Sequence, residues 1–312
     1  MKTYLGEIAG LITALFWALT SIFFTLAGRD VGSRTVNRIR LLLAVPLLAL
    51  VHLLVGGSLI PLHASAERWG WLALSGLIGL VIGDGLLFYA FTQIGARLSM
   101  LLMALNPIIG ALLVWGFLEE RLRPVEMAGI ALSVTGVAWV VLERRRPPRA
   151  HSVSARASAA APIEVDRTYL FGVLCGLGAA TGQAVGLVLS KQGMRGGFPS
   201  LSASLMRVMA ATVAIWIGAA LRCDVRDSFR ALSDRRALGF LVGGTLVGPV
   251  FGMTLSLVAV QFSQVGVAST LMALSPVLML PLSHWIFGER ITPRAVIGTL
   301  IAMSGVTLLF AA

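Results

Sequence analysis

Ten apolar stretches, separated by short polar segments, run through this chain of 312 residues. Crossing the hydrocarbon core of a membrane takes roughly 20 residues of helix, because a rise of about 1.5 Å per residue must cover about 30 Å. The stretches are continuous rather than short and alternating, which disfavours a membrane β-barrel. We therefore predict an all-α integral membrane protein with ten transmembrane helices. The predicted spans are approximately 5–27, 36–55, 70–93, 96–117, 124–142, 169–190, 200–221, 237–262, 266–287 and 293–311.

Composition supports a membrane protein and narrows its partners. Hydrophobic residues make up 57% of the chain and charged residues 12%, which leaves too little polar surface for a soluble globule of this size. The net charge of +11 could suggest nucleic acid, but the charges lie in short loops, so membrane topology explains them better. Cys175, Cys223 and the scattered histidines lack the spacing of a metal site. We predict no metal, cofactor or nucleic-acid partner.

From Met103 to Gly136 the chain has motifs that recur at a fixed offset of 169 residues. The segment Met103-Ala104-Leu105-x-Pro107 recurs as Met272-Ala273-Leu274-x-Pro276. Further along, Glu120, Gly129 and Gly136 recur as Glu289, Gly298 and Gly305, and each Glu is followed by Arg and then by Pro124 or Pro293. A basic segment rich in Ala, Ser and Pro separates the copies. We predict a first repeat at 1–142, a flexible linker at 143–168 and a second repeat at 169–312.

Five spans per copy is an odd number, so the second copy enters the membrane from the opposite side. The copies are then inverted repeats, an arrangement that produces alternating access when the two halves exchange conformations. Most of the arginines follow odd-numbered spans, above all in 143–168 and 222–236. The positive-inside rule places these loops in the cytoplasm and both termini outside.

The paired motifs resemble the EamA-type branch of the drug/metabolite transporter superfamily. The resemblance covers essentially the whole chain, and it makes 1–142 and 169–312 two EamA-like five-helix repeats. It implies a ten-helix bundle with a central cavity that moves small metabolites such as amino acids, often outward. It implies no particular substrate.

Four residues are candidates for gating. Pro107 and Pro276 each remove a helical hydrogen bond, so they either bend the bundle passively or serve as symmetric hinges, the interpretation we favour. Arg40 and Arg207 align between the copies, near the starts of spans two and seven. They either reach the two membrane interfaces or line the two mouths of the pathway and favour anionic groups. Arg38 points elsewhere on the helix and is expected at the lipid interface.

The remaining repeated residues suggest structure rather than chemistry. Glu120 and Glu289 lie at the membrane edge, each just before a helix start. The glycines place small residues along one face of spans five and ten, where close packing needs them. They indicate either the seam between the halves or a homodimer interface. The residues concerned are Gly129, Gly136, Gly298 and Gly305.

Asp84 is the acidic residue nearest the middle of a span, between Gly83 and Gly85. An ionisable group there is costly and is functional by default, as a proton carrier or as a partner for a cationic substrate group. The structural alternative is a carboxylate that caps local helix disruption or lies at a cavity mouth. Other polar or aromatic residues at membrane depth could form interhelical hydrogen bonds, but together they describe an amphipathic cavity. These candidate substrate contacts are Trp17, Thr20, Phe88, Asn106, Gln183, Thr254, Gln261 and Ser275.

These features predict a secondary transporter in a bacterial-type inner membrane that exports a small, amino-acid-like metabolite, with protons as one source of energy. No catalytic residue is expected, because a lipid-modifying enzyme would need a nucleophile with a base, or clustered His and Asp. The alternative is a lipid-handling or scaffolding protein that never opens. The expected partners are a small-molecule substrate, membrane lipids and, in one interpretation of the glycines, a second copy of the chain.

Overall fold

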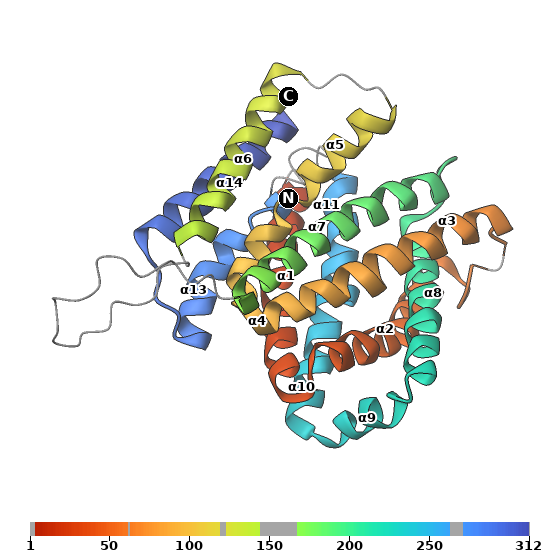
Figure 1. Ribbon diagram of the computed structural model, residues 1–312. Coiled ribbons are helices and arrows are strands. Elements are labelled where there is room, and N and C mark those ends of the chain that lie inside the picture. Colours follow the sequence, from red (N-terminus) through yellow and green to blue (C-terminus); the bar gives the residue numbers. More distant parts are fainter. Residues whose placement is uncertain (1–3, 62, 119–122, 144–166, 263–270, 312) are drawn as a thin grey trace.

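The computed structural model describes residues 4–61, 63–118, 123–143, 167–262 and 271–311, and these residues form a helical bundle (Figure 1). Its first half contains α1 (Leu5–Val31), α2 (Ser33–Gly56), α3 (Ala66–Gly76), η2 (Leu77–Gly83), α4 (Asp84–Met103), α5 (Asn106–Leu118) and α6 (Pro124–Glu143). Its second half contains α7 (Arg167–Gly193), α8 (Ser200–Leu221), α9 (Val225–Arg230), η3 (Ala231–Ser233), α10 (Arg235–Thr245), η4 (Leu246–Gly252), α11 (Met253–Phe262), α13 (Ser275–Phe287) and α14 (Pro293–Ala311).

Many of these helices are apolar and long enough to cross a membrane. Within the described residues, seven helical segments meet both conditions, and Ser275–Phe287 and Pro293–Leu308 are shorter apolar helices. The chain is therefore a multi-pass membrane protein. The seven are Leu5–Val31, Ser33–Gly56, Ala66–Met103, Pro124–Leu142, Arg167–Gly193, Ser200–Leu221 and Arg235–Ser256.

The long segment Ala66–Met103 is interrupted at Gly95. This residue has φ 81° and ψ 162° inside α4, a conformation open to glycine because it has no Cβ. The interruption falls between the predicted spans 70–93 and 96–117, which the helix assignment otherwise joins. Gly32, with φ 80° and ψ 149°, connects α1 to α2 in the same way.

Each repeated proline follows a break in its helix. Helix α4 ends at Met103, a turn follows, and α5 begins at Asn106 with Pro107 in its first turn. The second half repeats this at Ala273–Leu274, before Pro276 in the first turn of α13. Proline supplies no backbone N–H and clashes with the preceding turn, so an uninterrupted helix is unfavourable there. The bends expected at Pro107 and Pro276 are present as short turns.

Two π-helical segments, η2 and η4, begin 169 residues apart, at Leu77 and Leu246. In η4, Pro249 disturbs the regular hydrogen-bond ladder. The first half has no proline here; instead, the Asn37 side chain donates to the carbonyls of Leu80, at 3.0 Å, and Val81, at 3.3 Å. Such segments are rare and are frequent at functional sites.

The two halves interlock rather than lying apart. Helix α7 of the second half packs along α3, η2 and α4, whereas α1 of the first half packs along α10, η4 and α11. Helix α2 packs against α8, and α6 runs beside α14 at one end of the bundle (Figure 1). Each half thus supplies the neighbours of the other half's π-helical segment.

Candidate functional site

A buried ion pair lies where the two halves meet. Nη2 of Arg40 on α2 donates to Oδ2 of Asp84, the first residue of α4. Nε2 of Gln183 on α7 donates to the other carboxylate oxygen, Oδ1. The exposed fraction is 7% for Arg40 and 6% for Asp84. Three helices therefore converge on one carboxylate, and both of its oxygens have partners.

Further contacts fix the position of these groups. Nε of Arg40 donates to Oδ1 of Asn37, 3.1 Å away, while the amide of Asn37 binds the π-helical backbone. Nε2 of Gln183 also donates to the carbonyl of Gly79 at 3.3 Å. Because Asp84 follows η2 directly, its carboxylate lies beside the π-helical backbone that Asn37 and Gln183 bind. The carboxylate bonds to α2 and α7, so it does not cap its own helix.

Two buried aromatic rings border the polar cluster on one side. The guanidinium carbon of Arg40 lies 4.9 Å from the ring centroid of Phe88 and 6.0 Å from that of Phe24. The two rings meet edge to face, with centroids 5.2 Å apart. A cation over an aromatic face is attracted by about 0.5–2 kcal/mol, more when desolvated. The Arg40 guanidinium is thus held between a carboxylate and two rings.

Arg207 reaches the same cluster from α8. A Cβ placed on Gly79 would lie 3.3 Å from Nη2 of Arg207 and 3.7 Å from Oε1 of Gln183, so these two groups share one neighbour. Arg207 is half-buried, and its buried Nε has no hydrogen-bond partner among the described residues. A buried donor that is left unsatisfied costs about 1–3 kcal/mol. The expectation that Arg40 and Arg207 lie at opposite interfaces or mouths is wrong, since both contact the first half's π-helical region.

The second half makes the corresponding contact without charge. Met253 follows η4 as Asp84 follows η2, and Trp17 aligns with Gln183. The Trp17 ring lies beside Gly252, where an added Cβ would be 3.3 Å from its Nε1. Thr20 packs on Gly248 and donates to the carbonyl of Gly244 at 3.5 Å. The polar residues Asp84 and Gln183 at the first π-helical segment therefore correspond to Met253 and Trp17 at the second.

The other candidate substrate contacts lie outside this cluster. Asn106 begins α5, and Ser275 begins α13, where its hydroxyl donates to the carbonyl of Met272 at 3.0 Å. The hydroxyl of Thr254 donates to Val250 within its own helical segment. The side chain of Gln261 and all of Glu120 fall outside the described residues.

The repeated glycines line the contact between α6 and α14. A Cβ on Gly136 would lie 2.4 Å from the backbone nitrogen of Ala302, and one on Gly305 would lie 2.5 Å from the carbonyl oxygen of Gly129. One on Gly298 would lie 2.4 Å from the Val140 side chain. The backbones therefore approach too closely for any larger residue. Of the two roles open from sequence, the structure places these glycines at a seam between the halves of one chain.

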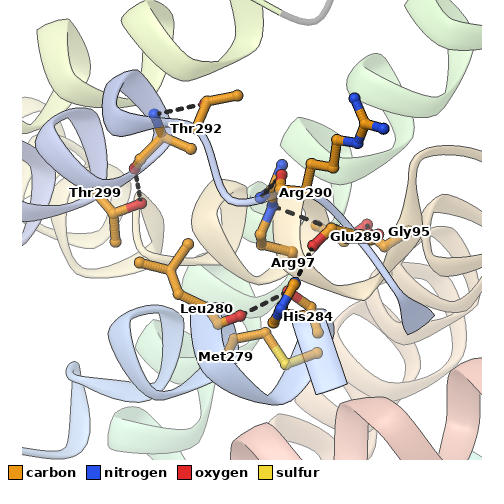
Figure 2. A network of polar contacts seen from close by, with 12 residues as sticks. Gly95, Arg97, Met279, Leu280, His284, Glu289, Arg290, Thr292 and Thr299 are labelled. Carbon is orange, nitrogen blue, oxygen red and sulfur yellow. Dashed lines mark hydrogen bonds and ion pairs between the residues drawn. The ribbon is translucent and has the colours of Figure 1, made fainter. Parts of the chain in front are cut away.

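Sequence reasoning missed an ion pair near the end of the bundle (Figure 2). Nε of Arg97 lies 3.3 Å from Oε2 of Glu289, and Nη1 of Arg97 donates to the carbonyl of Arg290 at 3.4 Å. The ring of His284 contacts the Glu289 carbonyl at 2.8 Å. The sequence offers one signal in retrospect: Arg97 is at the start of predicted span 96–117 and Glu289 just after span 266–287, which places both at the same side of the membrane. In the other repeat, glycine occupies position 266, which matches Arg97.

Arg38 also differs from expectation. Its guanidinium lies 3.0 Å from Oδ2 of Asp224 and donates to the Ser228 hydroxyl at 3.0 Å. Only 6% of the residue is exposed. The prediction of a lipid-interfacial Arg38 is therefore wrong, because α9 covers this side of α2.

Comparison with known proteins identifies the family. The model of the EamA-like transporter family matches residues 4–142 and, a second time, residues 170–311. The chain belongs to the EamA-like transporter family. The resemblance drawn from the paired motifs is confirmed, and this EamA-like protein is a membrane transporter of the drug/metabolite transporter superfamily.

A solved structure shares the fold of this EamA-like protein. It is described only as the crystal structure of a protein, with 19% sequence identity and a TM-score of 0.59. The alignment covers 97% of this chain and 94% of the other. At this identity the likeness concerns the fold alone. The search of curated proteins finds no match.

Proposed function

We propose that this EamA-like protein is a secondary transporter that exports a small organic metabolite by alternating access. One observation carries the proposal: a charged cluster is buried between the halves, with Arg40 and Asp84 from one and Gln183 and Arg207 from the other. Charged groups at membrane depth are expensive and mark substrate or ion pathways. In transporters built from repeats, the substrate site lies at the repeat interface.

The proposed architecture is ten crossings in two inverted five-helix repeats, with boundaries at 1–142, 143–168 and 169–312. The packing supports it, because α7 lies against η2 just as α1 lies against η4. Exchanging the two repeats turns the pair α2 and α8 into itself, and likewise the pair α6 and α14. Both pairs pack together. The proposed location is a bacterial-type inner membrane with odd-numbered loops in the cytoplasm.

Three features could serve the conformational cycle. The turns before Pro107 and Pro276 provide symmetric points where helices change direction. The pair of Arg97 and Glu289 joins the two halves near one end, and sequence position 266 has no charge to repeat it. Asp84 is the proposed proton carrier. Opening that end would then break this ion pair, whose arginine corresponds to a glycine at sequence position 266. The proposed cycle uses no catalytic residue or cofactor.

Reconstitution in liposomes tests transport against the alternative of lipid handling. Purified protein should support saturable, gradient-driven uptake of a radiolabelled metabolite from a panel of amino acids, sugars and nucleosides. Imposed pH gradients test proton coupling, and Asp84→Asn should remove any pH dependence while protein-free liposomes set the background. Scrambling of fluorescent lipid without saturable uptake of any solute would contradict the proposal.

The hinge role of the prolines gives a separate prediction. Pro107→Ala and Pro276→Ala should each restore a helical hydrogen bond, stiffen the turn and slow transport several-fold, with normal membrane insertion. Pro281→Ala is the matched control, since Pro281 lies inside α13 and its counterpart position 112 is leucine. Initial uptake rates normalised to inserted protein measure the effect. Wild-type turnover in both variants would contradict the hinge role of the two prolines.

A homodimer remains a proposal, and the small-residue seam is not available for it. Gly136 and Gly305 already contact the opposite half within one chain. Exposed apolar residues on other helices, such as Trp139 on α6 and Trp285 on α13, face away from the described core and contact lipid or a second copy instead.

A further inference from the structure

We propose that Arg207 binds a carboxylate group of the transported metabolite. This inference rests on the transport function proposed above and names the substrate class of the same site. It concerns the chemistry of one guanidinium group on α8, beside Gly79 of η2 and Gln183 of α7.

The charges in the cluster do not balance. Two guanidinium groups, those of Arg40 and Arg207, lie near one carboxylate, that of Asp84. Its two oxygens already accept from Arg40 and Gln183. Nε of Arg207 is buried without a hydrogen-bond partner among the described residues. The cluster therefore carries one positive charge that the described residues do not neutralise.

The repeat shows where a counter-ion is missing. The first half has both members of an ion pair, Arg40 on α2 and Asp84 after η2. The second half retains the arginine, as Arg207, but has Met253 in place of the acid. A buried charge is costly unless it is paired and hydrogen-bonded. An anion supplied by the substrate would complete the second pair.

The site favours a monoanion of carboxylate geometry. One unneutralised positive charge matches one negative charge, whereas a phosphate dianion would leave an excess. A guanidinium group presents parallel N–H donors that match the two oxygens of a carboxylate. The rings of Phe24 and Phe88 beside the cluster are 2% and 4% exposed, so they form a packed wall behind the charges. The inferred ligand is a small carboxylate.

Matched ligands test the inference directly. The full chain in neutral detergent is heated with benzoate or 4-methylpentanoate, and with benzamide or 4-methylpentanamide as the uncharged controls. Inorganic phosphate and glycerol 3-phosphate represent free phosphate and a lipid head group. We expect the carboxylates to raise the melting temperature in a saturable way, and the amides and phosphates to have no comparable effect.

Variants assign the effect to one side chain. Arg207→Gln should weaken carboxylate binding by at least about tenfold, because the ligand loses its charged partner. Arg207→Lys keeps the charge but loses the paired donors, so its affinity should lie between the two. Arg235→Gln, at an exposed arginine of α10, is the matched control and should bind as the wild type does.

Several outcomes would overturn the inference. They are a lack of stabilisation by either carboxylate, stronger stabilisation by the phosphates, and wild-type carboxylate affinity in Arg207→Gln. Size-exclusion profiles and ligand-free melting curves verify folding; if Arg207→Gln does not fold, unchanged affinity in Arg207→Lys overturns the inference instead.

Liposome uptake separates this inference from the transport function. Saturable uptake of a neutral solute that is unchanged in Arg207→Gln would contradict carboxylate recognition and leave transport intact. Carboxylate binding without gradient-driven uptake of any solute would contradict transport and leave the binding site.

Discussion

Asp84 and Arg40 stabilise one another as charges, and theirs is the ion pair that the described residues form within the cluster. The Asp84 side chain is 8% exposed and that of Arg40 is 9% exposed. The attraction in a buried pair roughly offsets the cost of desolvating both ions, so the pair itself adds little stability. Breaking it leaves one buried charge, which costs about 3–5 kcal/mol.

Asp84→Asn and Arg40→Met should therefore each destabilise the protein by about 3–5 kcal/mol, whereas the variant that combines the two should be much less harmful. Reversible unfolding in mixed detergent micelles measures the double-mutant cycle. Asp224→Asn is the matched control, because the Asp224 side chain that pairs with Arg38 is 34% exposed and should lose less. Additive losses in the Arg40 and Asp84 cycle would contradict the coupling.

At this scale the sequence identified the acid but not its environment. Asp84 could be singled out because an acidic residue in mid-span is costly wherever its partner lies. Arg40 and Gln183 could not be assigned to it, since they are 44 and 99 positions away and only packing brings them together. Arg38 was misplaced for a similar reason, because a helical wheel does not show that α9 covers that face.

The seam of α6 and α14 depends on the absence of side chains. Gly136→Ala should weaken it, because the new Cβ would lie 2.4 Å from the backbone nitrogen of Ala302, and backbone cannot rotate aside. Overpacking of this kind typically costs about 1–3 kcal/mol. Gly218→Ala on α8 is the control, since nothing lies within 4 Å of its added Cβ and alanine favours helix.

Melting temperatures in detergent check this pair of variants. We expect a clear decrease for Gly136→Ala and no decrease for Gly218→Ala. An equal response of both would show that close approach at the seam contributes nothing to stability.

At the scale of elements, helix breaks caused by local backbone chemistry could be predicted from the sequence. Irregular segments that depend on contacts between helices could not. The turns before Pro107 and Pro276 follow from the missing N–H of proline, so sequence sufficed. The π-helical segment η2 did not follow, because its irregular bonding accompanies contacts with Asn37 from another helix, which the sequence does not show. The interruption at Gly95 lies between two predicted spans, whereas the predicted span 96–117 is itself divided between α4 and α5.

The whole molecule explains why the paired arginines converge. Sequence alignment predicted opposite sides of the membrane for Arg40 and Arg207, since an inverted repeat reverses direction. In the arrangement proposed above, α2 and α8 exchange places about the symmetry axis and pack against each other. Equivalent residues near that axis lie close together. Distance from an axis is a property of packing, so a linear repeat could not supply it.

The inverted arrangement itself can be tested by labelling with a membrane-impermeant maleimide. Cys223 is exposed just after α8, and Ser58 is exposed just after the equivalent helix α2. Inverted repeats should place these positions on opposite sides, with Cys223 in the cytoplasm and Ser58 outside. Cys223 should react in inside-out vesicles but not in right-side-out vesicles. Ser58→Cys in a Cys223→Ser background should show the reverse.

The single variant Cys223→Ser is the control for this labelling. Its remaining thiol, Cys175, is buried in α7 and should stay unlabelled in both kinds of vesicle. Labelling of positions 58 and 223 from the same side would contradict the inverted topology, because α2 and α8 would then run in the same direction. Labelling from opposite sides with the preferences exchanged would keep the inversion and reverse only the orientation inferred from the basic loops. The two conclusions drawn from the sequence, symmetry and orientation, are thereby tested separately.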